Sequence, residues 1–259
     1  MAADLIVLRA SPDWEHFDME MSRLFLRRAG LPDDLVIEFA TLWDRSFKAD
    51  YRTVRAQLKA LAEATYRGVH GARLIPHEHW DEASSGPEAW IAFVDDDDWM
   101  APHLFEALGR PSAGHDGARW ANVRVGREFA DEPYPQGIIH RRPADTVLYT
   151  NNYAVTGRAV RRLGRAPLFE HFHAKTVFKD SSFNVLASNA YLSCAVKHPC
   201  STLSVKFLMQ RPDFRADPRA EMGRFVDALH ASEPLPEDAW LAGPYARFRA
   251  IMTDALKPR

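Results

Sequence analysis

The chain is poor in cysteine, with only Cys194 and Cys200 among its 259 residues. Two cysteines form at most one disulfide, which cannot staple a fold of this length, and their spacing does not match a paired zinc knuckle. Free cysteine is among the residue types most often found buried. We therefore expect two reduced thiols, one or both of them buried.

Long hydrophobic runs are also missing. The apolar stretch near the N-terminus covers only residues 5–10, whereas a membrane-spanning helix needs about 20 apolar residues. The stretch is likewise too short for the apolar region of a signal peptide. We expect a cytoplasmic protein without a transmembrane segment, and a peripheral association with the inner face of the membrane is compatible with the sequence.

The chain lacks a large excess of charge of either sign. It has 33 lysines and arginines and 35 aspartates and glutamates, which give a formal net charge of -2. Proteins that bind nucleic acid broadly usually carry a basic surface. We therefore expect no nucleic-acid partner, although a local basic patch for a phosphorylated ligand is compatible with this balance. The apolar fraction of 46% and aromatic fraction of 11% are typical of a globular protein.

Strand-like and helix-like patterns alternate through the first half of the chain. The patterns predict strands at residues 4–10, 72–76, 90–94, 119–125, 145–149 and 190–194. They predict helices at residues 12–29, 49–67, 102–108, 157–163, 221–229 and 236–256, and a loop at 77–88. Residues 35–47 are apolar but ambiguous, and we favour a strand followed by a loop.

This alternation is typical of the α/β class with parallel strands. We expect a Rossmann-like, mixed but mostly parallel sheet flanked by helices. The main α/β domain would cover residues 1–215, and a helical C-terminal tail at residues 216–259 would pack on it.

Four consecutive aspartates, Asp95 to Asp98, directly follow the strand predicted at residues 90–94. Like charges this close repel one another, and a divalent cation removes that conflict. Carboxylate oxygens favour magnesium, manganese or calcium over zinc, and ligands of open α/β sheets bind beyond the carboxyl ends of strands. The alternative is a solvated acidic turn before the helix at residues 102–108, since charge runs are usually solvated.

The segment Ala92-Phe-Val-Asp-Asp-Asp-Asp-Trp-Met-Ala-Pro102 resembles the Asp-x-Asp segment of GT-A type glycosyltransferases, especially bacterial family 2-like enzymes. The resemblance covers the alternating pattern from residue 4 to about residue 200. It implies a GT-A fold and a metal-dependent enzyme of polysaccharide biosynthesis, with Mn²⁺ or Mg²⁺ bridging the diphosphate of a nucleotide-sugar donor. The acceptor would be a carbohydrate or a glycan-lipid.

One feature departs from the family pattern. Family 2 enzymes usually open with an apolar strand ending in Pro-Thr-Tyr-Asn, whereas this chain has Val7-Leu-Arg-Ala-Ser-Pro12. The nucleotide pocket is therefore not assigned by that motif.

The resemblance also implies roles for the individual aspartates. Asp95 and Asp97 match the two motif aspartates, so Asp97 is the most direct metal ligand, and Asp95 faces the ribose or contacts the metal through water. We group Asp97 with Asp98 as catalytic residues and Asp95 with Asp96 as nucleotide-binding residues; one of Asp96 and Asp98 would contact the sugar. A bound cation would stabilise the negative charge that develops on the departing diphosphate.

Three histidines are candidates for a further metal ligand, which GT-A enzymes often take from a histidine late in the catalytic domain. His171 and His173 are expected on one face of a strand or close together in a loop, and His198 follows the strand predicted at residues 190–194. Each is also compatible with an ordinary surface or hydrogen-bonded histidine. Lys197, next to His198, is a candidate partner for a phosphate.

Further polar and aromatic residues border predicted strand ends. Arg9 and Ser11 end the first strand and are candidates for nucleotide binding. Asn151 and Asn152 are suited to hydrogen-bond sugar hydroxyls, or else to act as turn and cap residues. Trp99 borders the acidic run, where it would contact a sugar or pack beneath the metal-binding loop.

An inverting glycosyltransferase needs a general base near the acceptor hydroxyl. The family pattern supplies it from a Glu-Asp pair, but the only such pair here, Glu237-Asp238, falls in the predicted tail. We name Glu170 and Asp180 as substitutes. Inverting and retaining chemistry both stay open.

Three other functions are compatible with parts of the sequence. A nucleotidyltransferase shares the carboxylate and metal chemistry, but it usually carries a glycine-rich phosphate loop that Arg9-Ala-Ser-Pro12 does not match. A metal-dependent hydrolase would combine His171 and His173 with the aspartates and act without a nucleotide. A non-catalytic carbohydrate-binding protein would need Asp95 and Asp97 only for stability.

Overall fold

The computed structural model of the chain describes residues 3–9, 35–126, 138–144, 151–164, 171–201, 205 and 207–257. The helix predicted at residues 12–29 and the strand predicted at residues 145–149 lie outside these residues. The chain forms two compact units. The first comprises Met1–Ala10, Ala62–Arg124 and His140–Ala195, and the second comprises Ser11–Leu61, Val125–Ile139 and Val196–Arg259. The predicted boundary at residue 215 stays a prediction.

An eight-stranded sheet has the order β2-β1-β3-β7-β5-β8-β4, with β6 paired to β5. Its strands are β1 (Asp4–Leu8), β2 (Ala72–Pro76), β3 (Trp90–Val94), β4 (Trp99–Met100), β5 (Gly117–Gly126), β6 (Ile139–Arg142), β7 (Tyr153–Thr156) and β8 (Val185–Lys197). β1 pairs in parallel with both β2 and β3. β7 pairs antiparallel with β3 and β5, and β4 pairs antiparallel with β8.

The α/β class and the flanking helices are confirmed, but the expectation of a mostly parallel sheet is wrong. The sheet is mixed, because β7 pairs antiparallel with β3 and β5 and β4 pairs antiparallel with β8. β7 has only four residues, Tyr153–Thr156, between a turn and helix α5. A strand of four residues is too short to show an alternation of apolar and polar residues, so the sequence pattern did not predict it.

The core of the first unit surrounds β1 and β3. All five residues of β3 are buried, which explains why Trp90–Val94 is an unbroken apolar run. One cluster joins these strands to the neighbouring helices and to β7: Leu5, Val7, Ile75, Trp80, Ile91, Phe93, Tyr153, Val155, Ala159, Val160, Ala174 and Phe183.

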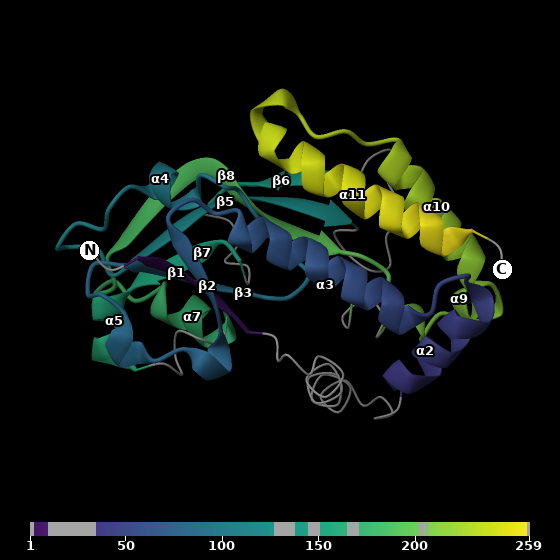
Figure 1. Cartoon of the computed structure of the whole chain (residues 1–259), viewed down its shortest axis with the longest axis horizontal. Helices are drawn as coiled ribbons and strands as arrows, with labels where there is room; N and C mark the ends of the chain where they lie inside the picture. Colours follow the sequence, from purple (N-terminus) through teal and green to yellow (C-terminus); the bar gives the residue numbers. More distant parts are fainter. Residues whose placement is uncertain are drawn as a thin grey trace. The chain divides into compact units, whose positions relative to one another are not determined.

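Several helices belong wholly or in part to the first unit (Figure 1). Among the described residues they are α3 (Tyr51–Arg67), α4 (Leu104–Leu108), α5 (Gly157–Leu163), α7 (His171–Val177) and the 3₁₀ helices η1 (His77–His79) and η2 (Glu82–Ser84). The prediction for α5 is confirmed at both ends, and Thr156 caps it by accepting a hydrogen bond from the Ala159 amide at 3.1 Å.

The second unit is mainly helical among its described residues. It contains α2 (Leu35–Ser46), the first part of α3, α9 (Pro212–Ala216), α10 (Pro218–His230), the 3₁₀ helix η3 (Pro236–Asp238) and α11 (Ala239–Leu256). α10 and α11 lie side by side (Figure 1). The prediction of a helical C-terminal segment is confirmed.

The prediction of a strand and loop at residues 35–47 is wrong, because α2 occupies Leu35–Ser46. Leu35, Phe39 and Trp43 recur every four residues, which is the spacing of a helix face, and all three are buried. The rings of Phe39 and Phe214 stack with centroids 6.0 Å apart. Because this helix has many apolar residues, its helical period is hard to recognise in the sequence.

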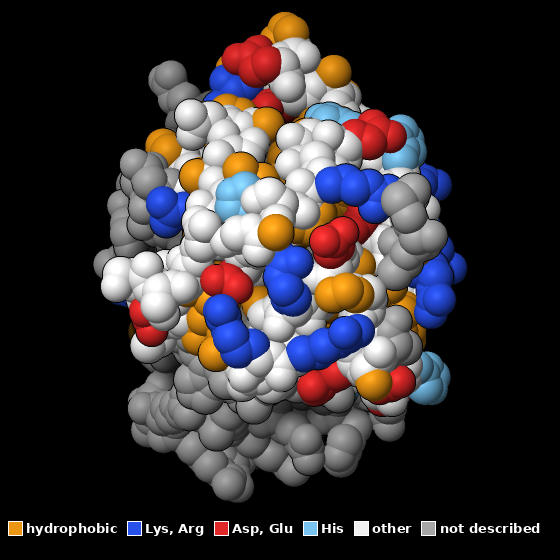
Figure 2. Space-filling model, turned by 90° about the vertical axis from the view of Figure 1, so that its left-hand side faces the viewer, with side chains coloured by type: hydrophobic (Ala, Val, Ile, Leu, Met, Phe, Trp, Pro, Cys, Tyr) orange, Lys and Arg blue, Asp and Glu red, His pale blue; other side chains and the backbone are white. Residues whose placement is uncertain are grey.

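Both cysteines are free and buried, as predicted. Burial raises the pKa of the Cys200 thiol, which keeps it protonated. None of the described helices is both long and apolar enough to cross a membrane. Figure 2 shows one face of the molecule, on which basic side chains are interspersed with acidic and hydrophobic ones.

Candidate functional site

The four aspartates Asp95–Asp98, here called the acidic turn, begin where the buried strand β3 ends. β1 and β3 are parallel neighbours with Leu8 opposite Val94, so their carboxyl ends lie together. The Arg9 amide donates to the Val94 carbonyl at 2.9 Å and thus extends the pairing by one residue. Arg9 and the acidic turn are therefore neighbours at the same edge of the sheet.

This edge is also a topological switch point. With the order β2-β1-β3, the chain leaves β1 for β2 on one side and leaves β3 for strands on the other side. In open α/β sheets, ligands bind outside the carboxyl ends of strands at such a point. The acidic turn thus lies where this architecture generally places a ligand.

The buried Arg9 forms an ion pair with the partly exposed Asp95 of the acidic turn. Its Nε lies 3.2 Å from Asp95 Oδ1, and the side chains are 7% and 38% exposed. Its Nη2 donates to the Phe93 carbonyl at 3.1 Å. Burial by itself lowers the pKa of Arg9, but Asp95, Tyr153 and Asp98 outweigh it, so the pKa is raised. Arg9 therefore supplies a permanent positive charge at Asp95.

Tyr66 contacts the acidic turn from the last turn of α3. Its hydroxyl donates to the main-chain carbonyl of Asp95 at 2.6 Å. Burial and then the negative charges of the four aspartates, Asp98 first, raise its pKa well above 10. The hydroxyl therefore stays protonated and remains a donor. The sequence prediction missed Tyr66, although it follows the buried Ala62 by four residues and continues that helix face.

Tyr153, on β7, also belongs to this site. Burial raises its pKa, the charge of Arg9 lowers it, Asp95 raises it, and a hydrogen bond with Arg9 lowers it, for a net value of about 12. Tyr153 was not predicted as a site residue either. Its only sequence signal is its place beside Asn152 before a helix, which also suits a core tyrosine.

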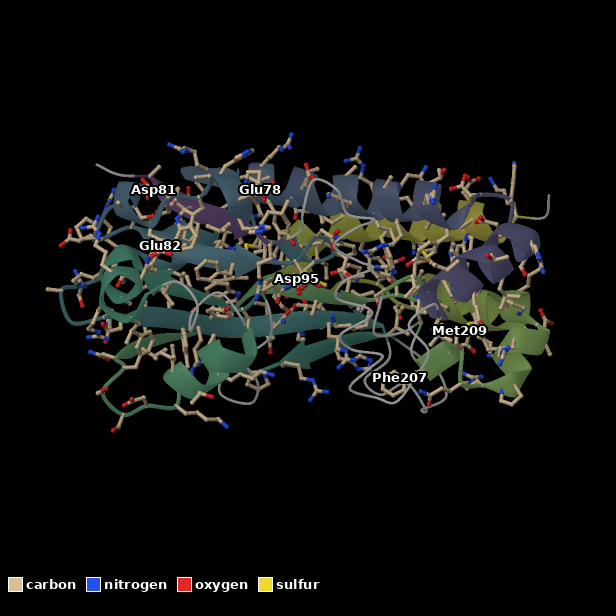
Figure 3. All side chains as sticks on the ribbon, turned by 90° about the horizontal axis from the view of Figure 1, so that it is seen from below. Glu78, Asp81, Glu82, Asp95, Phe207 and Met209 are labelled. Carbon is tan, nitrogen blue, oxygen red and sulfur yellow. The ribbon has the colours of Figure 1, made fainter. Side chains whose placement is uncertain are left out.

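The aspartates differ in their exposure. Asp95 and Asp97 are partly exposed, whereas Asp96 and Asp98 are buried, Asp98 completely. The two more accessible carboxylates are thus those that match the Asp-x-Asp motif. Figure 3 labels Asp95 together with Glu78, Asp81 and Glu82, which lie in the chain between β2 and β3.

Within the described part of the chain, no group of three or more His, Cys, Asp or Glu is arranged to hold a metal ion. The donor chemistry nevertheless fits Mg²⁺ or Mn²⁺. Mg²⁺ is usually held by one or two carboxylates together with substrate phosphates, rather than by a complete set of protein ligands. Asp97 and Asp95 are the residues that would hold such a cation.

The structure corrects the expectation for His171 and His173. Both lie in the first turn of helix α7, His171–Val177, and not in a strand or loop. The expectation of a strand or loop at these residues is therefore wrong, and their metal-binding role stays a prediction.

Lys197 and His198 belong to the second unit, whereas the acidic turn belongs to the first. His198 is buried, its Nδ1 accepts a hydrogen bond from the Cys200 amide at 3.2 Å, and its ring lies 6.1 Å from that of Phe248. These contacts are those of a core histidine. Phosphate binding by Lys197 and metal binding by His198 stay predictions.

Asn151 and Asn152 are fully buried and hydrogen-bonded within the protein. The Asn151 amide donates to the Cys194 carbonyl at 2.9 Å, and its Oδ1 accepts from Asn122 at 3.0 Å. The Asn152 amide donates to the Trp120 carbonyl at 3.1 Å. The structure therefore favours the turn and packing role over contact with sugar hydroxyls, because these amides face the interior.

Trp99 is also buried, and its main chain pairs with Cys194 in the sheet. Of the two roles predicted for it, the structure favours packing beneath the acidic turn, since the buried ring offers no open face to a sugar. Ser11 and Glu170 lie outside the described residues, so their predicted roles stay predictions.

Asp180 lies in an exposed turn after α7. Hydrogen bonds from the amide and the hydroxyl of Ser182, both 2.8 Å long, lower its pKa, and the charge of Arg162 lowers it further. A carboxylate with a lowered pKa is a weaker base. These contacts disfavour Asp180 as the general base.

Comparison with known proteins adds no family. No protein family matches the chain, and no curated protein matches it.

Proposed function

We propose that the chain is a metal-dependent glycosyltransferase of GT-A type that transfers a sugar from a nucleotide-sugar donor to a carbohydrate or glycan-lipid acceptor. The observation that carries the proposal is the acidic turn at the switch point between β1 and β3, with Asp95 and Asp97 partly exposed. This position and the hard oxygen donors suit a divalent cation shared with a diphosphate.

The residues of the site have different tasks in this proposal. Asp97 would hold the cation directly, because it is partly exposed and matches the second motif aspartate. Asp95 is paired with Arg9, and its carboxylate would face the ribose or contact the cation through water. When bound, Mn²⁺ or Mg²⁺ supplies the positive charge that stabilises the departing diphosphate. Asp98, fully buried, adds to the field that keeps Arg9 charged.

A thermal-shift panel tests the proposal. The protein is heated with UDP, GDP, CDP or dTDP, each with and without Mn²⁺, because a ligand of the native state raises the unfolding midpoint. We expect one diphosphate to stabilise the protein only when Mn²⁺ is present. Asp97→Asn should abolish this shift.

Asp81→Asn is the matched control, since Asp81 belongs to the same unit but accepts a hydrogen bond from the Ala83 amide outside the acidic turn. It should keep the metal-dependent shift. A folded Asp97→Asn variant that keeps the full shift would contradict the proposal. A shift with Mn²⁺ alone and none with any diphosphate would favour a metal-dependent hydrolase or a non-catalytic binding protein.

A further inference from the structure

The acidic turn is held at both of its ends by the last turn of α3. At its start, the Tyr66 hydroxyl donates to the Asp95 carbonyl at 2.6 Å. Just beyond its end, the Met100 amide donates to Thr65 Oγ1 at 3.2 Å. Two consecutive residues of one helix therefore fix the main chain at the first aspartate and two residues after the last.

The hydrogen bond of Tyr66 reaches the main chain and not a carboxylate. It leaves the oxygens of the Asp95 side chain to Arg9 and constrains the direction in which the chain leaves β3. A site that binds a small cation needs its ligands within about 0.5 Å of the productive geometry, which depends on such supporting contacts. Asp97 lies two residues after Asp95, so the orientation of the turn sets the position of its carboxylate.

We infer that Tyr66 is a positioning residue for the cation site: its hydroxyl fixes the acidic turn so that Asp97 faces the cation. The inference rests on the proposed function, because it takes Asp97 as the direct ligand. Tyr66 does not itself contact the cation or the donor. Its removal should therefore weaken cation binding without removing any ligand.

The helix provides its own control. Tyr51, at the other end of α3, is also buried and also donates its hydroxyl to a main-chain carbonyl, that of Cys200 at 2.9 Å. Tyr51→Phe and Tyr66→Phe therefore delete the same atom from the same kind of hydrogen bond. A purely structural role predicts similar effects of the two substitutions.

The test measures Mn²⁺ binding to the full chain by electron paramagnetic resonance of the free ion, alone and with each of the four nucleoside diphosphates. Loss of a group that orients a metal ligand typically weakens metal binding 10- to 100-fold. We expect Tyr66→Phe to weaken Mn²⁺ binding by about 10-fold or more. Tyr51→Phe should bind Mn²⁺ like the wild type, while both variants show a similar small drop in unfolding midpoint.

Equal Mn²⁺ binding by the Tyr66→Phe and Tyr51→Phe variants would overturn the positioning role and leave the proposed function intact. Failure of the wild type itself to bind Mn²⁺ under any of these conditions would instead overturn the proposed function. The two failures are thus distinguishable in one experiment.

Discussion

At the scale of single residues, the site is defined by how each polar group near β1 and β3 is paired. Arg9 neutralises Asp95, and two buried tyrosines, Tyr66 and Tyr153, adjoin this pair. Such groups are stable in the interior only when their hydrogen bonds and charges are satisfied. The ionisation of the tyrosines is therefore linked to the stability of the fold.

The raised pKa of Tyr153 predicts a loss of stability in alkali. Its pKa is about 12 in the folded protein and about 10 in an unfolded chain. This contribution to stability is fully present below pH 10 and is lost as pH rises through about 12, because the unfolded chain releases the proton first. Denaturant unfolding at several pH values should show the free energy of unfolding falling across this window.

Tyr153→Phe removes the titrating group and should reduce the fall between pH 10 and pH 12. Tyr191→Phe, which changes a partly exposed tyrosine, is the control and should behave like the wild type. An unchanged fall in the Tyr153→Phe variant would show that Tyr153 does not carry the shifted pKa.

At the scale of elements, the sequence prediction was most accurate for the helices and strands with a clear local sequence pattern. The strands at residues 72–76 and 90–94 and the helix α5 were placed correctly, because turn or cap residues bound each of them. α2 was mistaken for a strand because apolar residues fill more than one of its faces. β7 was missed because its four residues pair with strands distant in sequence.

The junction of α5 with the loop that precedes β3 depends on a glycine. A Cβ at Gly157 would collide with the main-chain carbonyl oxygen of Gly86, because the first turn of α5 packs directly on residues 86–89. Gly157→Ala should lower the free energy of unfolding by about 1–3 kcal/mol, the usual cost of overpacking. Denaturant unfolding measures this change.

The same substitution in open space should have the opposite sign. Gly223 lies inside α10, and a Cβ there meets no atom within 4 Å. Gly223→Ala should raise stability by roughly 0.5–1 kcal/mol, because alanine favours the helix. Two alanine variants with the same effect would show that the contact with Gly86 does not govern the junction.

At the scale of the whole molecule, the sequence located the candidate site better than it identified its members. The acidic turn was predicted because it follows a strand that is apolar throughout, and the structure places it at the end of β3. Tyr66 and Tyr153 were missed, since they are distant in sequence and have the pattern of core residues. Asn151 and Trp99 were predicted as candidate site residues, but both are buried. Burial depends on tertiary packing, which the local sequence does not record.

We propose that the acidic turn binds a divalent cation for a nucleotide-sugar reaction. The most direct measurement is cation-dependent release of nucleoside diphosphate from a set of nucleotide sugars by the wild type, Asp97→Asn and Asp81→Asn. We expect turnover of one nucleotide sugar that requires Mn²⁺ or Mg²⁺. Asp97→Asn should lower this turnover at least about 100-fold, the scale for losing one charge-stabilising group, whereas Asp81→Asn should leave it unchanged. A folded Asp97→Asn variant as active as the wild type, or turnover that persists in a metal chelator, would contradict the proposal.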